Sequence, residues 1–195
     1  MTEWLAYTIA SMEVFFGDRR VRTIKGDITR VPGDAIVTAA NSALQGGGGL
    51  DGAIHRTGGP KIMEDLDRIR AAQGKCDVGE AVITRAGDLP AKFVIHTVGP
   101  SWREGARGLD ELLASCYHRC LQMAEARGLR IVNFPSISTG AFHYPLLEAA
   151  DVAMETVVNY LLRTQGSLET VTFVLFDDDT LHAYAAALRR RMPLD

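Results

Sequence analysis

An acid and a histidine stand four residues apart just after a run of glycines, a combination suited to acid–base chemistry beside an anion. Asp51 and His55 share one face of any helix that begins near residue 51. The glycines at 46–49 let a ligand approach the backbone closely, and successive N–H groups ahead of a helix bind phosphate. Asn41 adds an amide that can donate to and accept from a sugar hydroxyl. We therefore expect a phosphate and a sugar to bind beside a titratable pair.

Simpler explanations stay open for each part of this stretch. The glycines could form a flexible linker, although a linker is not expected between a buried strand and a helix start. Asp51 lies in a first helical turn and could be an ordinary N-cap. The glycine loop before Asp51 and His55 beside it favour the functional interpretation.

A second loop, at 136–145, offers similar chemistry. Ser138, Thr139 and Gly140 supply hydroxyls and amides, and Phe142 supplies a flat apolar surface. One such loop could bind a single phosphate. Two facing loops would hold a pyrophosphate from both sides.

Short apolar runs of β type alternate with longer helical patterns, and these elements must position both loops. We expect strands at 12–16, 19–27, 34–40, 80–86, 92–99, 131–138 and 170–176, the first two as an antiparallel pair. We expect a short helix that begins with 51–55, and further helices at 60–74, 109–128, 146–166 and 178–191. This alternation predicts an α/β domain with a largely parallel or mixed sheet and helices on both faces. Ligands bind beyond the carboxyl ends of such strands, where both loops lie.

The composition is that of one ordinary globular domain. The chain has 195 residues, 47% of them hydrophobic and 23% charged, with a net charge of -3. This charge provides no general attraction for nucleic acid or an anionic membrane. The first basic residue is Arg19, so the apolar start lacks the flank of a signal peptide, and we expect a cytoplasmic protein. Cys116 and Cys120 fit the core face of a helix, and with Cys76 they indicate reduced thiols.

The remaining polar residues have structural explanations. We expect His96 to be a hydrogen-bonded structural histidine within a strand, and His118 and His182 to lie on helix surfaces. The acids at 177–179 are placed to cap a helix, and the arginines at 189–191 to form its solvated end.

Five fragments together resemble the macrodomain family, and more narrowly its MacroD-type branch. The fragments are GDIT (26–29), DAIVTAAN (34–41), GGGGLDGAIH (46–55), LPAKFVIHTVGP (89–100) and PSISTGAFHYP (135–145). MacroD-type proteins remove mono-ADP-ribose from acidic protein side chains and deacetylate O-acetyl-ADP-ribose. The resemblance covers nearly the whole chain from about Val21. It implies a single domain over 1–195 with an N-terminal extension at 1–11. The implied fold is a three-layer α/β/α arrangement around a mixed six-stranded sheet, with ADP-ribose in a cleft across its top.

The resemblance also implies roles for individual residues. Asp27 would accept a hydrogen bond from the adenine amino group, the Ile28 backbone would contact the ring, and Phe176 would form an adenine wall. The two loops would hold the pyrophosphate, and Phe142 and Asn41 would fix the distal ribose. The implied ADP-ribose-binding residues are Asp27, Ile28, Asn41, Gly46, Gly47, Gly48, Gly49, Leu50, Asp51, Ser138, Thr139, Gly140, Ala141, Phe142 and Phe176.

Asn41, Asp51 and His55 would be the catalytic residues in this comparison. Asp51 would orient or deprotonate a water molecule, and His55 would position Asp51 or the ribose. Neither a metal nor a cofactor is implied. The expected partners are ADP-ribose and mono-ADP-ribosylated proteins, with ADP-ribosylated nucleic-acid ends as an alternative, and we expect a monomer that does not bind membranes. A non-catalytic ADP-ribose reader would need the loops and Asp27 but not the Asp51–His55 pair.

Three residues depart from the family pattern. Thr38 stands where asparagine is common and is expected to alter strand packing slightly, and Ala141 replaces a larger aliphatic residue. His143 replaces a glycine, so it must tolerate a backbone conformation that glycine adopts more freely. We expect His143 to change selectivity among leaving groups more than affinity for ADP-ribose.

Overall fold

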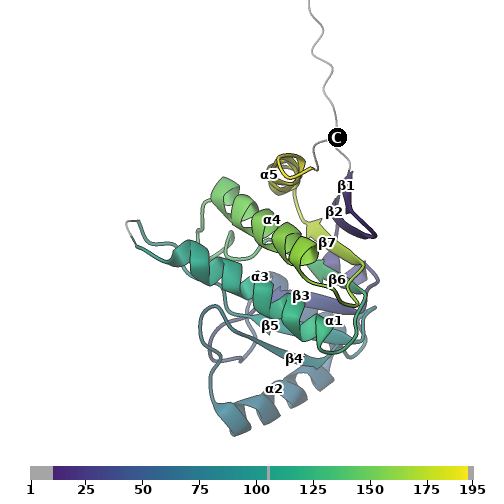
Figure 1. Ribbon diagram of the computed structural model, residues 1–195. Helices are drawn as coiled ribbons and strands as arrows, with labels where there is room; N and C mark the ends of the chain where they lie inside the picture. Colours follow the sequence, from purple (N-terminus) through teal and green to yellow (C-terminus); the bar gives the residue numbers. More distant parts are fainter. Residues whose placement is uncertain (1–10, 105, 193–195) are drawn as a thin grey trace, which may run out of the picture.

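A mixed seven-stranded sheet organises the computed structural model, which describes residues 11–104 and 106–192 (Figure 1). The strand order is β1-β2-β7-β6-β3-β5-β4. β2, β7, β6, β3 and β5 run parallel, and β1 and β4 pair antiparallel at the two edges. The strands are β1 (Ser11–Phe16), β2 (Arg19–Lys25), β3 (Ala35–Ala39), β4 (Ala81–Arg85), β5 (Phe93–Thr97), β6 (Ile131–Phe134) and β7 (Thr170–Leu175).

The sheet has one strand more than the six that the family resemblance implied. The additional strand is β1, which pairs with β2 along its whole length, from Ser11 opposite Ile24 to Phe16 opposite Arg19. The alternation of the sequence had predicted this opening antiparallel pair. Apart from Ser11, the expected extension at 1–11 lies outside the described residues.

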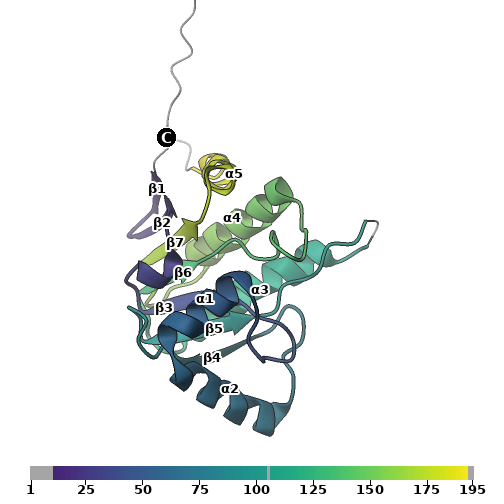
Figure 2. The same cartoon turned by 180° about the vertical axis from the view of Figure 1, so that it is seen from behind.

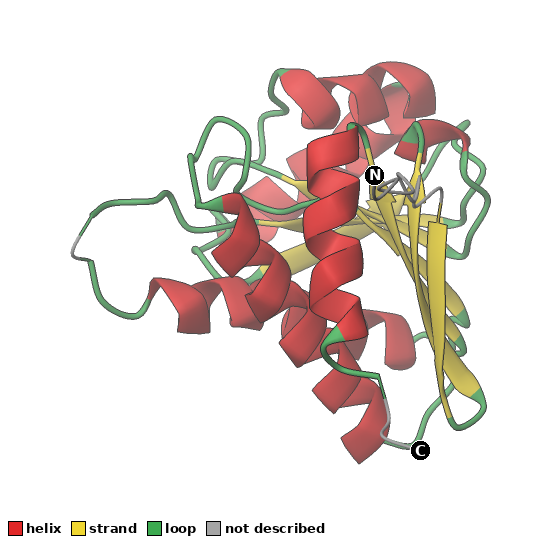
Figure 3. Ribbon diagram, turned by 90° about the horizontal axis from the view of Figure 1, so that it is seen from above, coloured by secondary structure: helices red, strands yellow, loops and turns green. Residues whose placement is uncertain are grey.

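Helices cover both faces of the sheet, so the three-layer α/β/α prediction is confirmed. α1 (Gly49–Gly58) and α2 (Pro60–Gln73) lie on one face (Figure 2). α3 (Leu109–Glu125), α4 (Leu146–Arg163) and α5 (Asp178–Arg189) share the core on the other face (Figure 1). From above, the strands fan out as the sheet twists between the helices (Figure 3).

Strand alternation decides which core each side chain enters. Ile36 and Val94 pack toward α1 and α2, whereas their neighbours Val37 and Ile95 pack toward α3 and α4. Because side chains two residues apart point to the same face, Thr38 and His96 lie on the α1 side. Both residues therefore end beneath α1 at the carboxyl ends of their strands.

Several local predictions can be compared with the structure. Cys116 and Cys120 are fully buried on α3 and unpaired, as expected. Asp177 caps α5 by accepting a hydrogen bond from the Thr180 amide at 2.8 Å. The helix end at 189–191 is solvated as expected, with Arg189 and Arg190 exposed. Arg190 and Arg191 also bond to the Asp151 carboxylate, which the sequence did not indicate. None of the described helices is long and apolar enough to cross a membrane.

Candidate active site

Asp51 is a buried carboxylate held against the sheet. α1 begins at Gly49 with Gly48 as its N-cap, so Asp51 lies inside the first turn and is not the cap. Its side chain is 6% exposed, and its Oδ1 accepts a hydrogen bond from Thr38 Oγ1 at 3.0 Å. Burial raises the pKa of Asp51, and the charge of His55 and the hydrogen bond from Thr38 oppose this rise. Thr38 therefore holds the carboxylate, a role that the sequence did not indicate.

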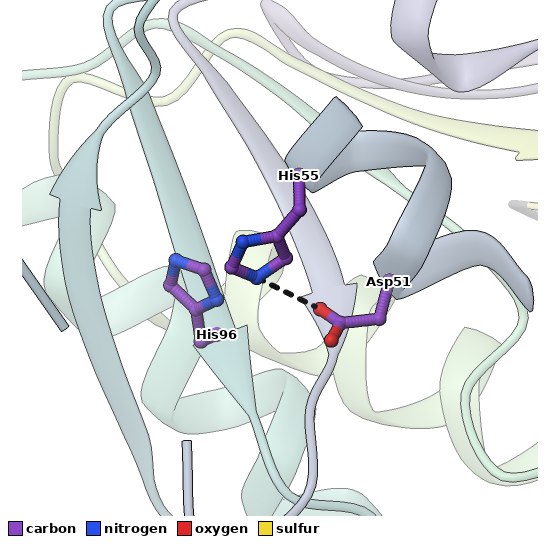
Figure 4. Close-up of side chains that lie close together, drawn as sticks. All are labelled: Asp51, His55 and His96. Carbon is purple, nitrogen blue, oxygen red and sulfur yellow. Dashed lines mark ion pairs between the residues drawn. The ribbon is translucent and has the colours of Figure 1, made fainter. Parts of the chain in front are cut away.

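His55 lies between Asp51 and a second histidine, His96 (Figure 4). His55 Nε2 is 3.7 Å from Asp51 Oδ1, which is an ion-pair distance but too long for a hydrogen bond. The His55 and His96 ring centroids are 5.9 Å apart. His96 is fully buried, and burial, with the charge of His55, lowers its pKa to about 3. His96 is therefore a neutral imidazole at pH 7.

The first two glycines of the loop pack on this pair, and the next two face open space. A Cβ added to Gly46 would lie 3.8 Å from His55 Nε2, and one added to Gly47 would lie 3.4 Å from Asp51 Oδ2. Gly48 and Gly49 would contact nothing within 4 Å. Asn41 braces this loop by donating from Nδ2 to the Gly46 carbonyl at 2.7 Å.

A cavity of about 590 Å³ lies beside this loop, at the carboxyl ends of β2, β6 and β7. Its volume suits a small organic ligand. Of the residues predicted to bind ADP-ribose, the cavity is lined by Asp27, Ile28, Gly49, Leu50, Thr139, Gly140 and Phe176. The other predicted site residues lie outside this lining: Asn41, Gly46, Gly47, Gly48, Asp51, His55, Ser138, Ala141 and Phe142.

One end of the cavity has the features of a base-binding pocket. Asp27 Oδ1 accepts hydrogen bonds from the amide and hydroxyl of Thr29 at 3.0 and 2.6 Å, and these bonds hold the pKa of Asp27 below its usual value. Its Oδ2 faces Arg30 at 3.5 Å. Ile28 is buried, whereas the Phe176 ring is 85% exposed at the cavity rim. An aromatic face this exposed is available to a planar ligand.

A chain of buried hydroxyls connects the core to the second loop. Tyr117 and Tyr184 are fully buried with their hydroxyls 3.3 Å apart, and Tyr184 donates to Ser136 Oγ at 2.9 Å. Ser136 Oγ lies 2.6 Å from Thr139 Oγ1, which lines the cavity. Ser136 and Thr139 share one hydrogen bond, in which either hydroxyl can donate. The chain thus ties a hydroxyl of the cavity lining to the buried core.

The second loop has a strained backbone. Ser138 has φ of 66° and His143 has φ of 53°, a region in which residues with a side chain are uncommon. His143 therefore adopts the conformation for which its expected glycine counterpart would be suited. Its amide donates to the Gly140 carbonyl at 2.9 Å, and the Phe142 carbonyl accepts from the Trp102 amide at 2.7 Å. These contacts fix the loop beside the cavity.

A family model for the macro domain matches residues 37–153, more than half of the chain. The chain belongs to the macrodomain family. The macrodomain is 49% identical over 172 residues to a Salmonella typhimurium protein named O-acetyl-ADP-ribose deacetylase, covering 88% of this chain and 96% of that protein.

Solved structures agree with this assignment. An Oceanobacillus iheyensis macrodomain with ADP is similar, with a TM-score of 0.88 and 38% identity, over 93% of this macrodomain and 96% of that chain. A Trypanosoma brucei macrodomain in complex with ADP-ribose matches with a TM-score of 0.78 and 36% identity. That match covers 86% of this macrodomain and 68% of the other chain.

Sequence reasoning placed Asp51 and His55 together but missed their neighbours on the sheet. Thr38 was assigned only to strand packing, and His96 only to the core. The alternation of side chains along a strand could have indicated Thr38. Side chains two residues apart point to the same face, so Thr38 shares the α1 face of the macrodomain sheet with buried Ile36.

Proposed function

We propose that this macrodomain hydrolyses the ester of O-acetyl-ADP-ribose and releases ADP-ribose from proteins modified on acidic side chains. The main observation is the buried Asp51 carboxylate, fixed by Thr38 beside His55 and directly under the glycine loop. The name of the Salmonella typhimurium relative supports the deacetylase part. The second substrate has the same ester chemistry.

The cavity supports binding of ADP-ribose. Adenine would lie between Ile28 and Phe176 with its amino group toward Asp27, and the pyrophosphate would cross the N-terminus of α1. The first amides of a helix have no partner within it, so Gly49 and Leu50 offer donors to an anion. Thr139 would donate from the opposite side of the cavity. The distal ribose would then extend past Gly48 toward Asn41 and Asp51.

Asp51 would act as the general base in the chemical step. A water molecule attacks the carbonyl carbon of the ester while Asp51 accepts one proton from that water. The bond between the carbonyl carbon and the ribose oxygen then breaks, and Asp51 returns the proton to this oxygen, which leaves as a hydroxyl and restores the carboxylate. The raised pKa of Asp51 makes it a stronger base than an exposed aspartate. His55 would hold the carboxylate in position.

The test measures turnover and binding separately. Wild type and Asp51→Ala are assayed on O-acetyl-ADP-ribose and on proteins modified separately on glutamate, serine and arginine. Losing a positioned base slows turnover by ~10²–10⁴-fold, so Asp51→Ala should lose most ester cleavage but still bind ADP-ribose in calorimetry. Asp18→Ala, at an exposed turn between β1 and β2, is the control and should remain active. Full activity of Asp51→Ala would rule out this role.

A non-catalytic ADP-ribose reader is the second candidate. It is favoured by one observation, that neither Asp51 nor His55 lines the cavity. A wild-type protein that binds ADP-ribose but releases no product from any ester would establish this alternative. ADP-ribosylated nucleic-acid ends are a further substrate for the same assay. The three unpaired thiols fit the cytoplasm, where we expect the protein to act as a monomer.

A further inference from the structure

Three polar atoms without hydrogen-bond partners meet beneath the glycine loop. Within the part of the chain that the structure describes, Asp51 Oδ2, His55 Nε2 and His96 Nδ1 are buried and have no partner. The ligand atoms that these three side chains offer lie within 4.8 Å of one another. Figure 4 shows the carboxylate and both rings together, with His55 in the middle. Buried polar atoms are nearly always paired, so three at one point indicate a ligand.

The hydrogen bonds around His96 suit the tautomer that leaves its Nδ1 free to bind a ligand. Thr84 donates its only hydroxyl proton to the Arg85 carbonyl at 3.1 Å. The same oxygen lies 3.0 Å from His96 Nε2 and can then accept a proton from that nitrogen. In the tautomer with its proton on Nε2, His96 directs the lone pair of Nδ1 toward His55 and Asp51 (Figure 4).

We propose that Asp51, His55 and His96 form a binding site for a divalent transition-metal ion such as zinc. His96 supplies Nδ1, Asp51 supplies a carboxylate oxygen, and neutral His55 with its proton on Nδ1 supplies Nε2. Thr84 behind His96 and Thr38 behind Asp51 orient two of the ligands. Such partners behind the metal ligands are a regular feature of zinc sites.

The ligand set selects zinc, cobalt or nickel over magnesium and calcium. Imidazole nitrogens suit these transition metals, whereas magnesium and calcium prefer an all-oxygen shell. Zinc bonds of about 2.1 Å place tetrahedral ligands roughly 3.4 Å apart, close to the 3.7 Å between His55 Nε2 and Asp51 Oδ1. Side-chain rotations can bring the third ligand, His96, within bonding distance of the ion.

Zinc at this site inhibits ester hydrolysis, a consequence that rests on the proposed function. The metal occupies the Asp51 oxygens needed to accept a proton from water, and it holds His55 in the coordination sphere. Metal binding itself depends only on the three side chains. Zinc binding and inhibition by zinc can therefore be tested separately, and either can be refuted without the other.

The first experiment measures zinc binding to the metal-free protein by calorimetry. We expect one zinc ion per chain, with no heat from magnesium at the same concentration. Thr84→Val preserves shape but removes the acceptor that fixes the His96 proton, and it should weaken zinc binding by ~10–100-fold. Thr23→Val is the matched control, because its buried hydroxyl has no partner among the described residues, and its affinity should equal that of the wild type.

Direct ligands are tested with His55→Gln and Asp51→Asn, and cobalt serves as a spectroscopic probe. Each variant should lose one-to-one zinc binding, and the visible bands of bound cobalt in the wild type should disappear. Circular dichroism verifies that each variant is folded. Undiminished zinc binding in both variants, or no zinc binding by the wild type, overturns the metal site.

Inhibition is measured in the ester assay with zinc added. Inhibition should follow the calorimetric affinity and shift with it in Thr84→Val. If zinc binds but turnover is unaffected, the inhibitory part is wrong. If the wild type binds zinc but has no turnover on any ester, the proposed function fails while the metal site stands.

Discussion

Thr38→Val should displace the pH dependence of catalysis, because Thr38 stabilises the ionised form of Asp51. The substitution keeps the shape of a fully buried side chain and removes the 3.0 Å hydrogen bond from its hydroxyl to Asp51 Oδ1. A hydrogen bond to a charged group contributes about 1.5–3 kcal/mol. One pKa unit corresponds to about 1.4 kcal/mol, so the pKa of Asp51 should rise by a further ~1–2 units.

The assay is kcat/KM for O-acetyl-ADP-ribose as a function of pH. The acid limb reports the ionisation of the free enzyme, so it should move upward by ~1–2 pH units in Thr38→Val. Rates above the new pKa should recover substantially, because Asp51 is again ionised there. The control is Thr23→Val, a fully buried strand threonine whose hydroxyl has no partner within the described residues, and its profile should not move.

Stability gives an independent measurement with a defined sign. The folded-state pKa of Asp51 lies above its unfolded value of 3.8, so the protein loses stability as pH rises from 3.8 through the folded pKa. Thr38→Val should extend this loss to higher pH. An unchanged acid limb together with unchanged stability at neutral pH would refute the role of Thr38 in holding Asp51.

Three further predictions concern the loops and the base of the sheet. Tyr184→Phe breaks the hydroxyl chain to Ser136 and should lower the free energy of unfolding by ~1–2 kcal/mol in denaturant titrations. It should also weaken ADP-ribose binding, and unaltered binding would contradict the role of this chain in holding Thr139 for the ligand. His143→Gly should relieve a left-handed φ and raise the free energy of unfolding by ~1 kcal/mol or less. It should also change the ratio of hydrolysis rates on different esters, and identical ratios would show that His143 does not determine selectivity. Burial raises the pKa of Asp34, but hydrogen bonds from Lys92 and two backbone amides hold it below its usual value. Asp34→Asn should therefore lower the free energy of unfolding by about 1–3 kcal/mol at pH 7. The difference in stability from wild type should vanish below the folded pKa of Asp34, and a difference that stays constant in thermal unfolding at acid pH would argue against this linkage.

Much of the fold followed from local patterns. The paired strands at the start, the helices after each loop and the burial of Cys116 and Cys120 were predicted from alternation and helical spacing alone. The two loops were placed at strand ends by the same reasoning. The first helix was underestimated, because Gly49 and Leu50 already belong to it and a glycine-rich start gives a weak helix signal.

The neighbours of Asp51 could not be found in this way. His96 was expected to be a structural histidine, and its bond to Thr84 fits that expectation. Its position beside His55 depends on β3 pairing with β5, which sets Thr38 opposite His96. Local sequence contains no information on which strands pair, because that order is decided by contacts between distant segments.

The sequence by itself determined the chemical groups and their local spacing, including the glycines and the shared helix face of Asp51 and His55. Only the tertiary structure decided that Thr38 fixes the carboxylate, that Gly46 and Gly47 cover it, and that His96 completes a three-residue cluster. The physical reason is that helix periodicity acts over a few residues, whereas burial and sheet pairing join residues far apart in the chain. Those long-range contacts set the pKa of Asp51 and the direction of each lone pair.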